Sequence, residues 1–280
     1  MSDQPNLPKE QKYENADGLR IAYRSWQPAG APKAAVVIVP GFNSHSGYYG
    51  WTANELAAQG YVVYAVDLRG RGLSDGERFY VDTIDQYAAD VDGVVKLANA
   101  QHSGLKIFVL GHSAGGVTAC IYTLDHQQAV AGLICESFAY QTPAPDFAVA
   151  ALKGLSHLAP HAHVLALPNK AFSRDATVVA AMDADPLIAH ETQPTKTIAA
   201  LARADDRLKA SFGEIKVPVL ILHGTEDKAT KYQGSQFFYE HAGSADKTLK
   251  LYDGHYHDML NDIGKEQVMA DIAGWLAAHA

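Results

Sequence analysis

The sequence predicts an α/β fold in which a mostly parallel central sheet is flanked by helices and a helical cap is inserted between two sheet strands. Short, continuous apolar runs, typical of strands buried on both faces, alternate with stretches of helical periodicity. This alternation stops between residues 138 and 212, where six prolines interrupt helical stretches and no buried-strand run occurs. We therefore expect a core of residues 1–137 and 213–280 and a cap of residues 138–212, a size that suits the 280-residue chain.

Strands are predicted wherever apolar and β-branched residues run together without helical spacing. In chain order these runs cover residues 12–15, 19–26, 34–40, 61–68, 106–110, 130–135, 217–223 and 248–252. The first two flank Asp17-Gly18, a dipeptide typical of a hairpin turn, so they should pair antiparallel. The later strands are separated by helices, which indicates parallel pairing with right-handed crossovers.

Helices are predicted where apolar side chains recur three and four residues apart. In chain order they cover residues 51–59, 84–99, 114–124, 147–158, 232–241 and 263–279. Gly60 should stop the first of these, and the last is amphipathic. Residues 147–158 are nearly all apolar or small on one side, and we expect this cap helix to wall a ligand pocket, because open α/β sheets bind ligands at the carboxyl ends of their strands.

Composition excludes several classes of partner. The chain has 23 basic and 31 acidic residues, a net charge of −8 and no basic run, which argues against nucleic acid. Cys120 and Cys135 are expected to be small buried residues rather than a disulfide framework. The first ten residues lack the apolar stretch of a signal peptide, and no run is long enough to span a membrane, so we expect a cytoplasmic protein. The sequence predicts no particular oligomeric state.

The candidate nucleophile is Ser113, within Gly111-His-Ser-Ala-Gly115. A predicted strand ends just before this motif and a predicted helix follows it, which is the strand–turn–helix setting of a nucleophilic serine. Ser74 lies in a second G-x-S-x-G match, but its strand ends several residues earlier and no helical pattern follows. We therefore interpret Ser74 as a loop residue.

A serine nucleophile needs a base and a carboxylate that orients it, in the chain order serine, acid, histidine. Both candidate loops follow predicted strands. The first contains Asp227, with Glu226 beside it, and the second contains His255 and His257. Glu136, after an earlier strand, could also reach the histidine. We favour Asp227 and His257, although spacing alone does not separate the histidines.

Two main-chain N–H groups should stabilise a developing oxyanion, and we expect them from Phe42 and Ala114. His45 and Tyr49, on the same loop as Phe42, either shape the mouth of the pocket or only pack the loop. His157 and His161 are spaced for zinc, but Pro160 interrupts the turn and no carboxylate or cysteine completes a site. We expect no metal and no cofactor, since the sequence has neither a dinucleotide fingerprint nor a phosphate loop.

These motifs resemble the α/β-hydrolase fold, and within it the monoacylglycerol lipase or lysophospholipase-like branch. The resemblance spans nearly the whole chain and rests on the segments at residues 41–49, 67–74, 111–116, 172–175, 183–187, 223–227 and 252–262. It implies a triad of Ser113, Asp227 and His257. The chain departs from that branch at Pro40, where a histidine is usual, and at Ala114, where methionine is frequent. Neither departure removes a backbone donor, but both change the shape expected for the pocket.

The sequence therefore predicts a cofactor-free serine ester hydrolase. By resemblance its substrates are monoacylglycerols, lysophospholipids or small carboxylic esters. Alternatives are a small-ester carboxylesterase with perhydrolase side activity, or a non-catalytic ligand-binding protein with this fold. We expect a small-molecule ester or lipid as the partner, with at most weak membrane-surface contact through the cap, since no basic face accompanies it.

Overall fold

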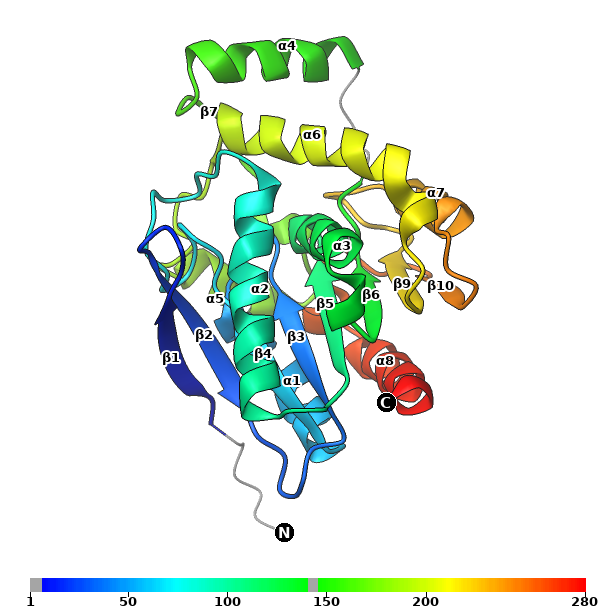
Figure 1. Cartoon of the computed structure of the whole chain (residues 1–280). Coiled ribbons are helices and arrows are strands. Elements are labelled where there is room, and N and C mark those ends of the chain that lie inside the picture. Colours follow the sequence, from blue (N-terminus) through cyan, green and yellow to red (C-terminus); the bar gives the residue numbers. More distant parts are fainter. Residues whose placement is uncertain (1–6, 141–145) are drawn as a thin grey trace.

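The computed structural model describes residues 7–140 and 146–280, and within them eight strands form one mixed sheet. Figure 1 shows this sheet at the centre of the molecule. Its strands are β1 (Lys9–Glu14), β2 (Arg20–Trp26), β3 (Ala34–Val39), β4 (Tyr61–Val66), β5 (Ile107–His112), β6 (Gly132–Glu136), β9 (Val219–Gly224) and β10 (Lys247–Tyr252), side by side in the order β1-β2-β4-β3-β5-β6-β9-β10. The predicted α/β fold with a mostly parallel sheet is confirmed.

Helices cover both faces of the sheet (Figure 1). They are α1 (Gly50–Ala58), α2 (Ile84–Gln101), α3 (Ala114–Asp125), α7 (Tyr232–His241) and α8 (Lys265–His279). Residues of β3 alternate between two cores because successive strand side chains point to opposite faces. Val37 packs in the core that includes α2 and α3, and Val36 packs in the core with α1 and α8.

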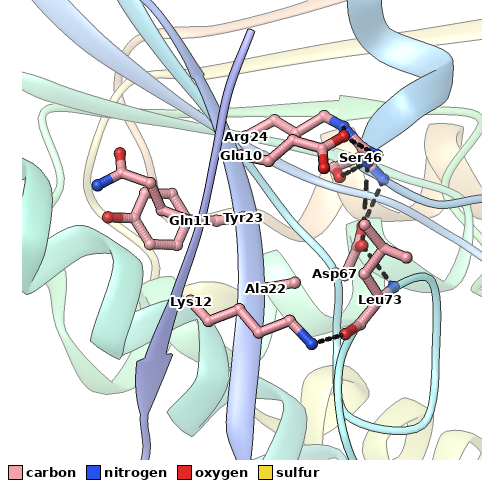
Figure 2. Close-up of a pocket in the computed structure, with 9 residues that line it drawn as sticks. All are labelled: Glu10, Gln11, Lys12, Ala22, Tyr23, Arg24, Ser46, Asp67 and Leu73. Atoms are coloured by element: carbon pink, nitrogen blue, oxygen red, sulfur yellow. Dashed lines mark hydrogen bonds and ion pairs between the residues drawn. The ribbon is translucent and has the colours of Figure 1, made fainter.

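The β1–β2 hairpin is the antiparallel edge of the sheet, as Asp17-Gly18 predicts. Gly18 adopts a φ of +76°, which suits a residue without a Cβ. Figure 2 shows contacts of the hairpin: Arg24 pairs with Glu10 within the hairpin at 2.6 Å and donates to Ser46 Oγ, on the loop after β3, also at 2.6 Å. Lys12 Nζ donates to the carbonyl of Leu73 on the loop after β4. These contacts hold the loops after β3 and β4 against the sheet edge.

Between β6 and β9 the chain forms α4 (Asp146–Leu158), β7 (His163–Leu165), α5 (Ala176–Ala184), β8 (Gln193–Pro194) and α6 (Thr195–Ser211). Figure 1 shows α4 and α6 across the top of the sheet, on the side toward which β3 and β5 point. The pairing of β7 with β8 was not predicted, because strands of three and two residues are too short to carry an apolar pattern. No helix in the described ranges is long and apolar enough to cross a lipid bilayer.

Candidate active site

The turn after β5 presents Ser113 in a conformation that few residues adopt. Ser113 has φ +56° and ψ −122°, although it is not a glycine. Such backbone strain costs on the order of 1–3 kcal/mol and is concentrated at functional sites. It persists here because Ser113 N–H donates to the carbonyl of Glu136 and Ser113 C=O accepts from Gly116 and Ala139.

Glycines allow three backbone segments to meet at Ser113. A Cβ on Gly115 would lie 2.1 Å from the carbonyl oxygen of Val39, and one on Gly111 would lie 2.5 Å from that of Gly115. A Cβ on Gly41 would lie 2.8 Å from the Cβ of Ser113. The loop after β3 therefore contacts the nucleophile directly. Ala114 is the first residue of α3, so its N–H has no acceptor within the helix.

The loops after β9 and β10 bring Asp227 and His257 together. His257 Nδ1 donates to Asp227 Oδ2 at 2.7 Å, and both side chains are almost completely buried. His257 Nε2 is buried and has no hydrogen-bond partner in the described part of the chain. The His257 ring centroid lies 4.8 Å from that of His112, the residue that precedes Ser113. The unpaired Nε2 is thus the atom through which His257 could act as base for a neighbouring serine.

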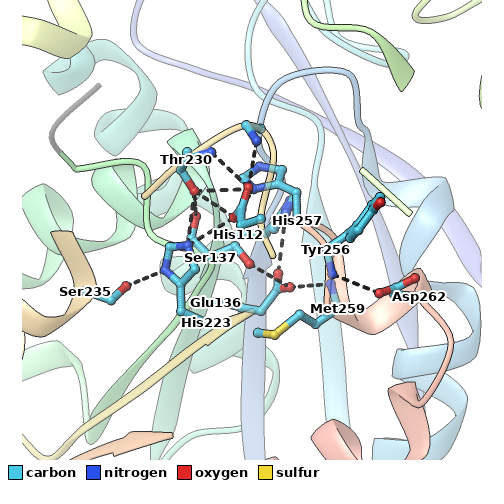
Figure 3. Close-up of polar contacts among 12 residues, drawn as sticks. His112, Glu136, Ser137, His223, Thr230, Ser235, Tyr256, His257, Met259 and Asp262 are labelled. Carbon is cyan, nitrogen blue, oxygen red and sulfur yellow. Dashed lines mark hydrogen bonds and ion pairs between the residues drawn. The ribbon is translucent and has the colours of Figure 1, made fainter. Parts of the chain in front are cut away.

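Asp227 is held as an anion by several donors around one carboxylate. Oδ2 also accepts from His223 Nε2 at 3.0 Å and from Thr230 Oγ1 at 2.8 Å, while Oδ1 accepts the N–H of Ala229 and of Thr230. Burial alone would raise the pKa of Asp227, but the neighbouring His257 and the hydrogen bonds from both histidines hold that pKa well below its usual range. Figure 3 shows His223 between Thr230 and Ser235, whose Oγ is 2.7 Å from His223 Nδ1.

The alternative residues have other partners. Glu136 Oε1 accepts the N–H of Met259 at 2.8 Å, while Glu226 pairs on the surface with Lys228. His255 Nδ1 lies 3.9 Å from Asp262. Ser74 Oγ accepts the N–H of Ala22 and donates to the carbonyl of Asp67, so its hydroxyl fixes a loop.

A buried cluster of polar side chains packs against the loop after β10, which carries His257. Among the described residues, His112, Glu136 and Asp258 form the one group of three possible metal ligands, with ligand atoms within 4.8 Å of one another. Burial and the nearby Asp258 raise the pKa of Glu136 well above its usual range, and burial raises the pKa of Asp258 to about 6. Two carboxyl groups that resist ionisation, already bonded to Met259 and Asn261, fit a structural network better than a metal centre.

An apolar cavity of about 400 Å³ opens beside Ser113. Its walls include the loop after β3, the turn at Ser113, α4, α6 and the segment around β7. The lining residues are Phe42, Ser113, Ala114, Ala139, Ala148, Val149, Leu152, Val164, Leu165, Leu167, Ile198, Leu201, Ala202, Ala229 and Thr230. Ser113 and Thr230 are the polar members of that lining, and the Thr230 hydroxyl donates to Asp227. The cavity therefore suits a hydrocarbon group held next to the serine.

Residues 30–264 match the family model described as serine aminopeptidase, S33. The chain belongs to this family. It is 31% identical to a monoacylglycerol lipase of Mycolicibacterium smegmatis, over 96% of this chain and 97% of that protein. It is 32% identical to the human monoglyceride lipase, over 94% of this chain and 88% of the relative. The predicted resemblance to the monoacylglycerol lipase-like branch of the α/β-hydrolases is confirmed.

A solved structure of similar sequence agrees with this assignment. The monoacylglycerol lipase of Paleococcus ferrophilus superimposes with a TM-score of 0.82 at 29% identity, covering 98% of this chain and all of that one. The S33-family chain is accordingly a carboxylic ester hydrolase.

His45 and Tyr49 of the hydrolase lie away from the cavity at Ser113. His45 Nε2 lies 2.8 Å from Asp185 Oδ2, and Tyr49 is completely buried. Neither is among the residues that line the cavity at Ser113. The sequence interpretation also left out His223 and Thr230 as partners of Asp227. His223 was detectable in principle, because it precedes Asp227 by four residues within the same motif.

Proposed function

We propose that this hydrolase cleaves monoacylglycerols and related single-chain carboxylic esters through a Ser113–His257–Asp227 triad and an acyl-enzyme intermediate. The observation that carries the proposal is the apolar cavity of about 400 Å³ beside Ser113. The 2.7 Å contact between His257 and Asp227 supports the chemistry, and the names of the curated relatives support the substrate class.

In the first half-reaction His257 Nε2 accepts the proton of Ser113 Oγ as that oxygen attacks the ester carbonyl. The amides of Phe42 and Ala114 donate to the resulting oxyanion. His257 then gives its proton to the alkoxide leaving group, so the alcohol departs and the acyl group stays on Ser113. Asp227 remains ionised throughout and fixes the tautomer that leaves Nε2 free to act as base.

In the second half-reaction water takes the place of the alcohol. His257 accepts a proton from the water as its oxygen attacks the acyl carbonyl, and the same two amides stabilise the second oxyanion. Collapse of this intermediate returns the proton to Ser113 Oγ and releases the carboxylic acid. The cavity contributes by burying the acyl chain, at about 0.8 kcal/mol for each methylene group removed from water.

The cap supports a weak contact with a lipid surface, where such substrates reside. The outer side of α4 exposes Phe147 and Leu158, with exposed fractions of 78% and 86%. Apolar side chains that are exposed together as a patch are typical of surfaces that contact membranes or other proteins. Replacing both with serine should reduce sedimentation with neutral phosphatidylcholine vesicles and leave hydrolysis of a soluble ester unchanged. Equal sedimentation of both proteins would contradict this contact.

The test of the function is hydrolysis of p-nitrophenyl esters from acetyl to dodecanoyl, beside a monoacylglycerol. Ser113→Ala is the blank. Ser74→Ala is the matched control, because Ser74 lies in the same G-x-S-x-G motif but not in a turn between a strand and a helix. We expect activity to rise toward medium or long chains and to disappear in Ser113→Ala alone.

Other outcomes favour the alternatives. A maximum at acetyl or butyryl would indicate a small-ester carboxylesterase, for which peroxide as the second nucleophile would test perhydrolysis. Activity that survives Ser113→Ala would refute Ser113 as nucleophile. Absence of turnover together with no labelling of Ser113 by a fluorophosphonate would indicate a non-catalytic binding protein.

A further inference from the structure

A buried ion pair joins the loop after β4 to the segment before β8. Arg71 and Glu191 have side-chain exposed fractions of 2% and 1%, and Arg71 Nη1 donates to Glu191 Oε1 at 2.5 Å. Arg71 Nη2 donates to Gln193 Oε1 at 2.8 Å, and Nε donates to Tyr87 Oη at 3.1 Å. All the nitrogens of the guanidinium group therefore have a partner, and its plane is fixed.

The pair also holds both sides of the residue expected to bind the oxyanion. The Arg71 guanidinium carbon lies 4.4 Å from the ring centroid of Phe42. Glu191 Oε1, the oxygen that binds Arg71, also accepts the N–H of Asn43 at 3.0 Å. The side chain of Phe42 and the peptide group that follows it are thus both bound to one ion pair.

The backbone at this point needs such support. Asn43 has a φ of +50°, in the left-handed region that few residues other than glycine adopt, although asparagine tolerates it better than most. Its side chain donates to the carbonyl of Leu167 and to Asn169 Oδ1, at 2.9 and 2.8 Å. Two segments of the chain between β6 and β9, residues 167–169 and Glu191, therefore meet on one residue of the loop after β3.

Stability alone does not explain this arrangement. Burying two charges costs desolvation that a pair regains only when all its hydrogen-bonding atoms are satisfied. Glu191 Oε2 is buried without a partner in the described ranges. A buried ion pair with an unsatisfied oxygen is a poor way to stabilise a fold but a specific way to fix a geometry. Arg71, Phe42 and Ala114 also line one narrow gap that is too small for a water molecule, so Arg71 lies near both candidate oxyanion donors.

We propose that Arg71 and Glu191 are positioning residues that hold the Phe42 amide in place for the oxyanion. The position of this amide then depends on how the segment that carries Glu191 packs against the loop after β3. This rests on the proposed ester hydrolysis at Ser113. Neither side chain touches the substrate. A loss of the pair would move a donor away from the oxyanion, and such a misplacement lowers the rate of the chemical step more than it weakens binding.

The test compares Glu191→Gln and Arg71→Lys with Asp90→Asn. Asp90, on α2, forms a similarly buried pair with Arg69 at 2.7 Å. Arg69 lies on the same loop as Arg71, but this pair does not contact the loop after β3 that carries Phe42. We expect the first two variants to lose about 10- to 100-fold in kcat for a p-nitrophenyl ester, with KM within about twofold. Asp90→Asn should lower Tm and keep kcat. Arg71→Lys keeps the charge, so it remains informative if Glu191→Gln does not fold.

Two further readouts separate positioning from general damage. The C=S group of a thionoester accepts hydrogen bonds more weakly than the C=O group of an ester. The rate ratio of ester to thionoester should therefore fall in both positioning variants and stay constant in Asp90→Asn. Hydrogen exchange at the Asn43 amide should accelerate in Glu191→Gln. Unchanged kcat in folded variants, or a constant ratio despite lower kcat, would overturn the inference. If the wild type shows no Ser113-dependent hydrolysis, the proposed function fails, and unchanged protection of the Asn43 amide would then still overturn the inference.

Discussion

Replacing Ala202 with leucine should shorten the acyl chain that the hydrolase accepts. Ala202 lies on α6, lines the cavity beside Ser113 and is 8% exposed. Leucine adds three carbon atoms, and the cavity of about 400 Å³ is the space into which they can extend. Those carbons occupy volume that the far end of a long acyl chain would otherwise fill.

The magnitude follows from the number of methylene groups displaced. Three groups at about 0.8 kcal/mol each give about 2.4 kcal/mol, which is a factor of about 60 in kcat/KM for an ester that fills the cavity. An acetyl ester does not reach that part of the cavity and should keep its rate. The assay is the ratio of kcat/KM for the dodecanoyl and acetyl p-nitrophenyl esters, below the concentration at which the longer ester forms micelles.

Ala277→Leu is the matched control, because Ala277 is exposed on α8 and the same substitution there adds no atoms to the cavity. Its ratio should equal that of the wild type. A lower Tm in Ala202→Leu than in the wild type would show that the leucine overpacks the protein instead of entering the cavity. Such overpacking destabilises a protein by about 1–3 kcal/mol. With Tm preserved, an equal loss for both esters, or no loss for either, would refute the assignment of this cavity to the acyl chain.

Three further substitutions test the site and its supports. Asp227→Asn should lower kcat by about 10⁴-fold in steady-state assays, because an amide stabilises the wrong tautomer of the base; a change below tenfold would mean that another acid serves. Glu136→Gln should reduce the loss of Tm between pH 5 and pH 8, since a carboxyl whose native pKa is raised binds its proton more strongly in the folded state and lowers stability as pH rises through that range, while Gln still accepts from Met259. Equal losses of Tm in both proteins would contradict this sign. Ser74→Ala should cost about 1–3 kcal/mol in denaturant unfolding, by leaving the buried N–H of Ala22 unpaired, and should not change kcat; a large fall in kcat would show that this serine takes part in the chemistry.

The residues proposed for the chemistry could be picked out from the sequence because each lies within a few residues of the end of a strand. Ser113 comes after β5, and Asp227 and His257 come after β9 and β10. In a parallel sheet the carboxyl ends of strands meet at one edge, so recognition of the strands was enough to predict that these loops would be neighbours. Context also separated Ser113 from Ser74, since only the first has a strand and a helix in direct contact with its turn.

The partners within the cap could not be predicted in the same way. Arg71 and Glu191 are 120 positions apart, and a sequence gives no sign that either charge is buried. Charged residues are mostly exposed, so a sequence alone favours a solvated position for both. His45 presents the same difficulty, because its partner Asp185 lies in a segment whose path over the sheet depends on many weak packing contacts.

This difference has a consequence for specificity. The cap provides α4 and α6 as walls of the cavity, and it also binds the loop that bears Phe42 through Glu191, Leu167 and Asp185. A substitution in the cap can therefore alter the acyl preference and the geometry of the oxyanion donors together. Under the proposed mechanism, selection among esters and the rate of ester cleavage are coupled, because one inserted segment lines the cavity proposed for the acyl chain and also binds the loop that carries the proposed Phe42 donor.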